Sequence, residues 1–579
     1  MRPGHRIEAD GRSHFRVFAP LKSAVHVTLP AGGKPVVLAR DGLGWWHGDT
    51  AALPAGTRYW IEADGVRLPD PASRCQPDGV HGPSAVVHEV GARSPGWRGV
   101  AIADALVYEL HLGSFTPEGT LAAAQGRLPY LRALGITVVE LMPLASFPGR
   151  HNWGYDGTFP YALHPGYGTL AELAGFIEAA HRQGLAVILD VVYNHFGPEG
   201  HYADQLAPYT QQAATPWGAA VNFDGPWNHG IRDFFLDNLR FWLEDVGFDG
   251  LRMDAVSLVF DLRPVHILRE CTALARAIGE RQGRTLLMIA EHLRNDRFVT
   301  ADAGFGFQSQ WNDDLHHALY AALTGESWRH YANFGAFDDV AKALADGFVL
   351  DGSRLCQHYR WPIGTDGRLT AATEHVVHIQ NHDQVGNRPQ GDRMLATHGR
   401  ARYLLALTAV LASPFVPMLF MGEEYGETAP FPFFADFGDA GLVDAVRRGR
   451  QAEFAAAGLP GAGTPDPCDP ATFAASKLDW SRAASAEGQA MLALVRQLLA
   501  WKRSGVLGPR DRAAVQVQAD AATRTITLRA PRSLTVLNLS DAAQRLPATA
   551  AGWRLGLATL PLSDTARLPA FGAAVFVTD

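Results

Sequence analysis

The sequence predicts an α/β protein, a (β/α)8 TIM barrel flanked by an N-terminal β-sandwich and a C-terminal antiparallel β-domain. Between about residues 105 and 421, short apolar runs alternate with segments of helical periodicity, as expected of parallel strands covered by helices. Outside this region, short alternating runs are separated by Gly- and Pro-bearing turns, which is typical of antiparallel sheets. The chain has 579 residues, more than one simple core accommodates, so several domains are expected.

Residues 1–90 are predicted to form a small β-sandwich. His14–Phe18 and Ala24–Leu29 are short runs with strand-like alternation, and Tyr59–Gly65 ends in an Asp-Gly turn signal. Several short strands joined by such turns favour two packed antiparallel sheets. The Gly- and Pro-bearing stretch Gly79–Gly99 is expected to be the linker to the next domain.

Residues 91–490 are predicted to form the barrel domain. Seven apolar runs are the expected strands, and an eighth, weaker run lies near Phe305–Gln310. The seven are Ala105–Leu110, Val138–Leu141, Ala186–Val192, Gly250–Met253, Leu286–Ala290, Val376–Ile379 and Val416–Phe420. Two apolar helical faces lie between them, formed by Leu170, Leu173, Phe176, Ile177 and Ala180 and by Ile231, Phe235, Leu239, Trp242 and Val246. A doubly wound open sheet is the rival architecture, but no Gly-x-Gly-x-x-Gly follows the first strand.

Residues 491–579 are predicted to form the C-terminal antiparallel β-domain. The segment Met491–Lys502 has helical periodicity and precedes the expected strands. These strands are Ala514–Val517, Thr525–Leu528, Leu534–Leu537 and Ala574–Val577.

Composition and charge exclude several classes of protein. The formal net charge is -8, whereas a nucleic-acid-binding protein is expected to carry a basic excess. The four cysteines are scattered, without the spacing of a zinc or disulfide framework. The first ten residues lack the apolar run of a signal peptide, so a cytoplasmic location is expected. The apolar stretch Leu404–Met421 is interrupted by Pro414 and Pro417, which favours a buried helix and strand over a membrane span.

Polar residues cluster directly after four of the predicted strands. The clusters are Asp190–His195, Gly250–Asp254, Ile289–His292 and Gln380–Gln384. In a barrel of this kind, the carboxyl ends of the strands build the active site. A single acidic residue at a strand end is more often a helix cap or an ion-pair partner. Four clusters at the same end, three of them with carboxylates beside His or Arg, favour a catalytic site.

These four segments closely resemble the signature regions of the α-amylase superfamily of glycoside hydrolases. The resemblance implies that Asp254 is the nucleophile, that Glu291 is the general acid/base, and that Asp383 binds ring hydroxyls and stabilises the transition state. Retaining glycoside hydrolysis needs two carboxyl groups about 5–5.5 Å apart, and neighbouring strand ends can supply them. The charges of Asp254 and Asp383 are expected to raise the pKa of Glu291 and keep it protonated.

The resemblance also implies five substrate-binding residues and no metal or organic cofactor. Arg252 is expected to keep the nucleophile ionised, whereas Asp190 is expected to support Arg252. The other four implied contacts are Tyr155, His195, His382 and Gln384. Without the motifs, the two histidines could equally be ordinary buried residues and Tyr155 could be plain packing.

Longer stretches are similar to the malto-oligosyltrehalose trehalohydrolase family. They include Asp70–Arg74, Gly79–Ser84, Gly197–Gly200, Thr215–Gly218, Val221–Pro226, Gln310–Asp314, Asn381–Arg388 and Phe420–Gly426. This resemblance implies cleavage of the α-1,4 bond next to the terminal trehalose of a malto-oligosaccharide. Two positions depart from the family pattern: Ser257 replaces an expected histidine, and the basic residues of Arg354–Trp361 are spaced apart.

Two alternatives remain open from the sequence. A glucan branching or debranching enzyme shares the N-terminal β-domain and the same three carboxylates. A non-catalytic glycogen-binding protein could use the same scaffold, although the intact set of Asp254, Glu291 and Asp383 argues against it.

Overall fold

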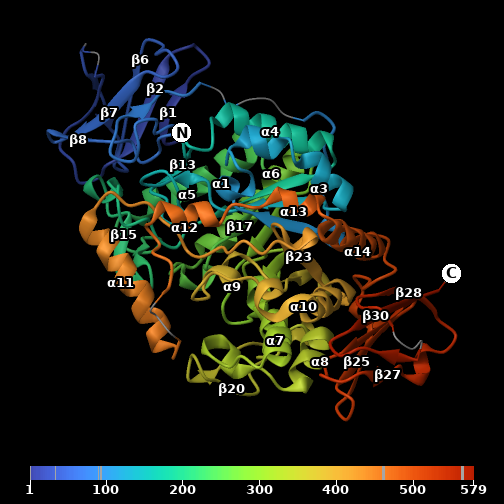
Figure 1. Ribbon diagram of the computed structural model, residues 1–579. Coiled ribbons are helices and arrows are strands. Elements are labelled where there is room, and N and C mark those ends of the chain that lie inside the picture. The colour runs from blue at the N-terminus through green and yellow to red at the C-terminus, as the bar shows by residue number, and fades with distance from the viewer. Residues whose placement is uncertain are drawn as a thin grey trace.

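The centre of the protein is a closed barrel of eight parallel strands (Figure 1). The computed structural model describes residues 2–30, 32, 34–88, 90, 94–459, 463–562 and 566–578. In spatial order, the barrel strands are β10 (Val107–Leu110), β11 (Val138–Leu141), β14 (Ala186–Val191), β17 (Gly250–Met253), β18 (Leu287–Ala290), β19 (Ser309–Trp311), β22 (His375–Val377) and β23 (Val416–Phe420). The predicted fold class is confirmed.

The strands are buried on both faces, which explains why they appear in the sequence as continuous apolar runs. Every residue of β11 and of β14 is buried. The sixth strand begins at Ser309, later than the run predicted near Phe305–Gln310. It has three residues, of which two are polar, so its apolar signal is weak.

Helices cover the outside of the barrel. Both predicted apolar faces are buried, one on α4 (Leu170–Arg182) and the other on α5 (Asn228–Arg240) and the π-helical turn Phe241–Val246 that continues it. Thr169 and Glu172 form a capping box that fixes the start of α4. The principal helices are α3 (Leu128–Leu134), α4 (Leu170–Arg182), α5 (Asn228–Arg240), α6 (Ile267–Gln282), α7 (Asp313–Thr324), α8 (Phe337–Asp346), α10 (Met394–Ala412), α11 (Ala440–Ala456) and α14 (Ala486–Arg503).

The N-terminal region forms two antiparallel sheets, at the upper left of Figure 1. One contains β1 (Gly4–Ile7), β2 (Ser13–Phe18), β6 (Trp45–Thr50) and β5 (Ala39–Arg40), and the other contains β4 (Val36–Val37), β3 (Val25–Thr28), β7 (Arg58–Ala63) and β8 (Val66–Leu68). The predicted linker Gly79–Gly99 is wrong in one part, because Ser84–Ala85 form strand β9, which pairs with β7. Gly230 of α5 lets this domain approach closely, since a Cβ there would lie 2.3 Å from the ring of Phe18.

The C-terminal region forms a five-stranded antiparallel sheet, at the lower right of Figure 1. Its order is β24 (Gln516–Asp520), β25 (Thr525–Ala530), β26 (Ser533–Asn538), β30 (Ala573–Val577) and β28 (Arg554–Ala558). The first predicted strand, Ala514–Val517, is partly wrong, because Arg512–Ala514 form a 3-10 turn capped by Asp511. Helix α14 begins at Ala486, so it spans the position 490 at which a domain boundary was predicted.

The long apolar stretch near residue 410 is a buried helix followed by a strand, as predicted. It comprises the second half of α10 and all of β23. Over the described residues, no helix combines the length and apolarity needed to cross a membrane.

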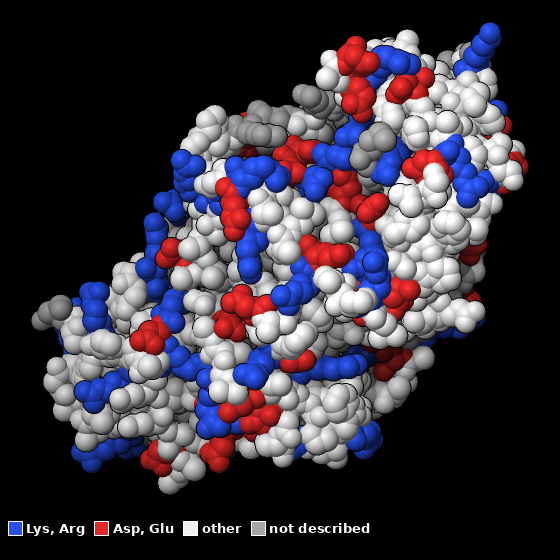
Figure 2. Space-filling model, turned by 180° about the vertical axis from the view of Figure 1, so that it is seen from behind, with Lys and Arg blue, Asp and Glu red and all other residues white. Residues whose placement is uncertain are grey.

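Acidic and basic side chains lie interspersed on the face shown in Figure 2. The predicted absence of a nucleic-acid partner stays a prediction.

Candidate active site

Arg252 lies at the centre of the polar cluster at the carboxyl ends of the strands. It is fully buried, and one nitrogen of its guanidinium contacts Asp190 at 2.8 Å and Asp254 at 2.9 Å. Its other terminal nitrogen lies 3.0 Å from Oε2 of Glu291. The ring of Trp311 packs against the same guanidinium, 4.0 Å from its carbon. One cation therefore links carboxylates from β14, β17 and the end of β18.

The acidic side chain of Glu291 is held through one of its two oxygens. Its Oε2 accepts a hydrogen bond from the backbone N–H of Ala255 at 2.8 Å, in addition to the contact with Arg252. Burial raises the pKa of Glu291 well above its usual value, with Arg252 opposing and the charges of Asp254 and Asp383 adding to the rise. The expected direction is therefore correct, but its main cause is burial rather than the neighbouring charges.

Asp383 lies on the short helix α9 (His382–Gly386), next to a charged histidine. Nε2 of His382 lies 3.6 Å from the Asp383 carboxylate, and its Nδ1 contacts Glu109 of β10 at 2.5 Å. Burial alone would lower the pKa of His382, but the charges of Glu109 and Asp383 outweigh it and raise the pKa to about 9. His382 is therefore a cation at neutral pH, and its charge opposes the rise in the pKa of Asp383 that burial causes.

This arrangement predicts a pH effect for the His382→Gln variant. The charge of His382 lowers the pKa of Asp383. Without that charge, Asp383 should take up its proton at a higher pH than in the wild type. If ionised Asp383 is required, the acidic limb of the kcat/KM profile should move to higher pH. Kinetics between about pH 4 and pH 8 measure the shift, with exposed His81→Gln as the control. An unmoved acidic limb would contradict this role for His382.

Tyr155 and His195, two predicted substrate contacts, lie beside the carboxylates. The hydroxyl of Tyr155 donates to Asp190 at 2.6 Å, and its ring stacks on His382 with centroids 5.1 Å apart. His195 hydrogen-bonds to the side chain of Asn194 and stacks on Trp217 at 5.4 Å. Asp190 contacts Arg252, in agreement with its expected supporting position.

Two polar partners were not singled out from the sequence. Asn194 donates from Nδ2 to Oδ2 of Asp254 at 2.8 Å, so both oxygens of that carboxylate have a partner. Glu109 orients His382 through the ring and through the backbone N–H. The sequence does contain a signal for this contact. Glu109 stands inside the apolar run Ala105–Leu110, where an unpaired charge is costly, so a polar partner is expected.

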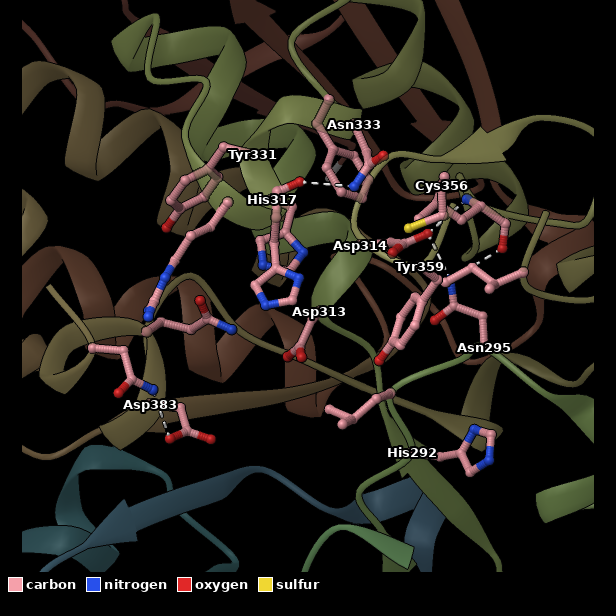
Figure 3. A pocket seen from close by; sticks show the side chains of 18 of the residues that line it. His292, Asn295, Asp313, Asp314, His317, Tyr331, Asn333, Cys356, Tyr359 and Asp383 are labelled. Carbon is pink, nitrogen blue, oxygen red and sulfur yellow. Dashed lines mark hydrogen bonds between the residues drawn. The ribbon is translucent and has the colours of Figure 1, made fainter. Parts of the chain in front are cut away.

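A pocket of about 250 Å³ opens beside Glu291, Asp383 and Gln384 (Figure 3). Most of its wall was not predicted. It comes from the loop after β18, from α7, from the segment Trp328–Phe334 that follows α7, and from the hairpin of β20 (Leu355–Cys356) and β21 (Trp361–Pro362). The additional lining residues are Trp217, His292, Leu293, Asn295, Asp313, Asp314, His317, Trp328, Arg329, His330, Tyr331, Asn333, Phe334, Leu350, Cys356, Tyr359, Ile363 and Asn387. The segment Arg354–Trp361, which departs from the family pattern, thus contributes to this wall. Ser257, the other departure, does not line it.

Among the residues that the structure describes, no group of three or more His, Cys, Asp or Glu side chains could hold a metal ion. The expectation of no metal and no cofactor stays a prediction.

The chain is similar to several known proteins. The family model of the alpha-amylase catalytic domain matches residues 71–218. The malto-oligosyltrehalose trehalohydrolase of Rhizobium sp. (strain M-11) is 42% identical over 569 residues, covering 92% of this chain and 95% of the relative. The enzyme of the same name from Saccharolobus solfataricus is 38% identical, covering 82% and 83%. The 1,4-alpha-glucan branching enzyme of Leifsonia xyli is 31% identical but covers only 55% of this chain and 44% of its own length.

Solved structures share the whole fold. A crystal structure from Salmonella typhimurium, described as an alpha amylase, superimposes with a TM-score of 0.90 at 38% identity and covers 100% of this chain and 99% of that one. A pullulanase from Anoxybacillus shares the fold with a TM-score of 0.74 at 18% identity, covering 100% and 87%. The chain is a glycoside hydrolase of the α-amylase superfamily and belongs to the malto-oligosyltrehalose trehalohydrolase family.

Proposed function

We propose that the protein hydrolyses the α-1,4 bond next to the terminal trehalose of a malto-oligosyltrehalose, with retention, and releases trehalose. The observation that supports this most directly is the single buried guanidinium of Arg252, which contacts both Asp254 and Glu291. Two carboxyl groups on one rigid cation suit a nucleophile and an acid that act on one bond. The names of the relatives support the choice of substrate.

In the first step, a carboxylate oxygen of Asp254 attacks the anomeric carbon, and the bond to the glycosidic oxygen breaks. Glu291 gives its proton to that oxygen, so trehalose leaves as a neutral alcohol. Because Oε2 of Glu291 already faces Ala255 and Arg252, we assign the transferable proton to Oε1. Asp383 and the cationic His382 hold the ring hydroxyls of the sugar that becomes attached to Asp254.

In the second step, Glu291, now ionised, takes a proton from a water molecule. The resulting hydroxide attacks the anomeric carbon, Asp254 is released, and a malto-oligosaccharide of unchanged anomeric configuration leaves. Arg252 contacts Asp254 at 2.9 Å and holds the nucleophile in place for the next turnover.

The product profile tests the proposal. The protein should release trehalose rapidly from maltopentaosyltrehalose and act slowly on maltopentaose, as measured by chromatography of the products. New α-1,6 linkages would instead establish a branching enzyme. Sugar binding without any product would establish a non-catalytic glycogen-binding protein.

A further inference from the structure

We infer that Tyr359, presented by the β20–β21 hairpin, is a specificity-determining residue that contacts the leaving disaccharide. The inference rests on the function proposed above, because it needs a sugar leaving group on the far side of Glu291. It assigns a role to the segment Arg354–Trp361, where the sequence departs from the family pattern.

Tyr359 occupies the same pocket as the acid/base. Both residues line the cavity, and Figure 3 shows the hydroxyl end of Tyr359 directed into it, between Asp313 and His292. Glu291 gives its proton to the glycosidic oxygen of the leaving group. The part of the pocket wall that lies next to Glu291 and away from Asp383 therefore faces the leaving group. Burial raises the pKa of Tyr359, although the nearby charge of Arg294 opposes the rise, so the hydroxyl stays neutral.

The hairpin is anchored firmly enough to present a ring in one position. Arg354 contacts Asp339 at 2.8 Å and donates to the carbonyl of Asn333 at 2.7 Å. The backbone N–H of Gln357 donates to the side chain of Asn333 at 2.6 Å. Leu350, Cys356 and Ile363 form a small apolar cluster against which Tyr359 packs. A preorganised ring of this kind loses little entropy when a ligand binds.

The β20–β21 hairpin also contacts the loop that follows the acid/base Glu291. The guanidinium carbon of Arg294 lies 5.7 Å from the ring centroid of Tyr359 and 5.8 Å from that of Trp361. Arg294 comes three residues after Glu291 in the chain. The positions of the phenol ring and of the acid/base loop are therefore coupled through one cation.

Three histidines of this wall suit an uncharged, hydroxyl-rich ligand. Burial lowers the pKa of His292 to about 4, that of His317 to about 3 and that of His330 to about 4. These imidazoles are neutral near pH 7, and each can donate one hydrogen bond and accept another. Arg354 is turned away toward Asp339, so the part of the segment that faces the pocket is aromatic rather than basic.

Two substrates separate leaving-group recognition from the chemical step. Maltopentaosyltrehalose has a disaccharide leaving group, whereas the fluoride that leaves α-maltosyl fluoride has no sugar to contact Tyr359. Tyr359→Ala and Tyr359→Leu should lower kcat/KM for the first substrate by about 10- to 100-fold, the usual effect of losing a buried aromatic contact. The same variants should change kcat/KM for α-maltosyl fluoride by less than about twofold. The leucine variant keeps an apolar side chain against Leu350, Cys356 and Ile363 and so guards against misfolding.

Leu355→Ala is the matched control, because Leu355 lies on the same hairpin, is 56% exposed and does not line the pocket. It should leave both substrates unaffected. An equal loss on both substrates in the Tyr359 variants, or no loss on either, would overturn the assignment. A wild-type protein that hydrolyses α-maltosyl fluoride but frees no trehalose would instead overturn the proposed function.

Discussion

Glu291→Gln is expected to lower kcat by about 10²- to 10⁴-fold, the usual contribution of a positioned general acid/base. Glutamine has nearly the same shape and can still accept from Ala255 N–H, but it cannot give a proton to the glycosidic oxygen. Binding of the oligosaccharide should persist, because the wall of the pocket is unchanged. Steady-state kinetics and calorimetric binding to maltopentaosyltrehalose measure the two effects separately.

The leaving group provides an internal check on this variant. Fluoride needs less help from an acid than a sugar alcohol does, so the first step on α-maltosyl fluoride should suffer less than that on maltopentaosyltrehalose. Glu487→Gln, on the exposed first turn of α14, is the control and should have normal activity. Near-normal hydrolysis by the Glu291 variant would remove this residue from the mechanism.

Arg252→Leu is expected to destabilise the barrel by about 3–5 kcal/mol, the usual cost of removing one partner from a buried ion pair. The substitution leaves three buried carboxylates without their common cation: Asp190, Asp254 and Glu291. Their mutual repulsion would then have no cation to offset it. Urea denaturation followed by tryptophan fluorescence measures the stability, and kinetics on the folded protein measures the accompanying loss of activity.

Arg240→Leu is the matched control for this effect. Arg240 forms a pair with Glu244 on the surface of a helix, with 41% of its side chain exposed, and such pairs contribute about 0–1 kcal/mol. A loss of stability in Arg252→Leu as small as that of the control would mean that the buried network contributes little to folding.

Most of the barrel could be predicted because parallel strands buried on both faces leave an apolar signature. The sixth strand was misplaced, since Ser309–Trp311 is short and mostly polar. In the C-terminal region, Ala514 lies in a 3-10 turn although it begins an apparently alternating run. Over so few residues, alternation does not distinguish a capped turn from the first residues of a strand.

The partners of the catalytic groups were harder to predict. Glu109 and His382 are 273 residues apart, so no local pattern relates them. The wall that contains Tyr359 comes from a two-stranded hairpin whose strands have two residues each, too short for any periodicity. Both features arise from how loops pack over the end of the barrel.

The order of the strands along the chain and the acidic residues that follow them were determined by the sequence itself, because the apolar pattern of a segment is a local property of its residues. Only the tertiary structure decided that burial, more than the neighbouring charges, raises the pKa of Glu291. It also decided which oxygen of Glu291 is held and which side chains line the pocket. Desolvation and hydrogen-bond geometry depend on every segment that covers a group, and those segments are distant in the chain.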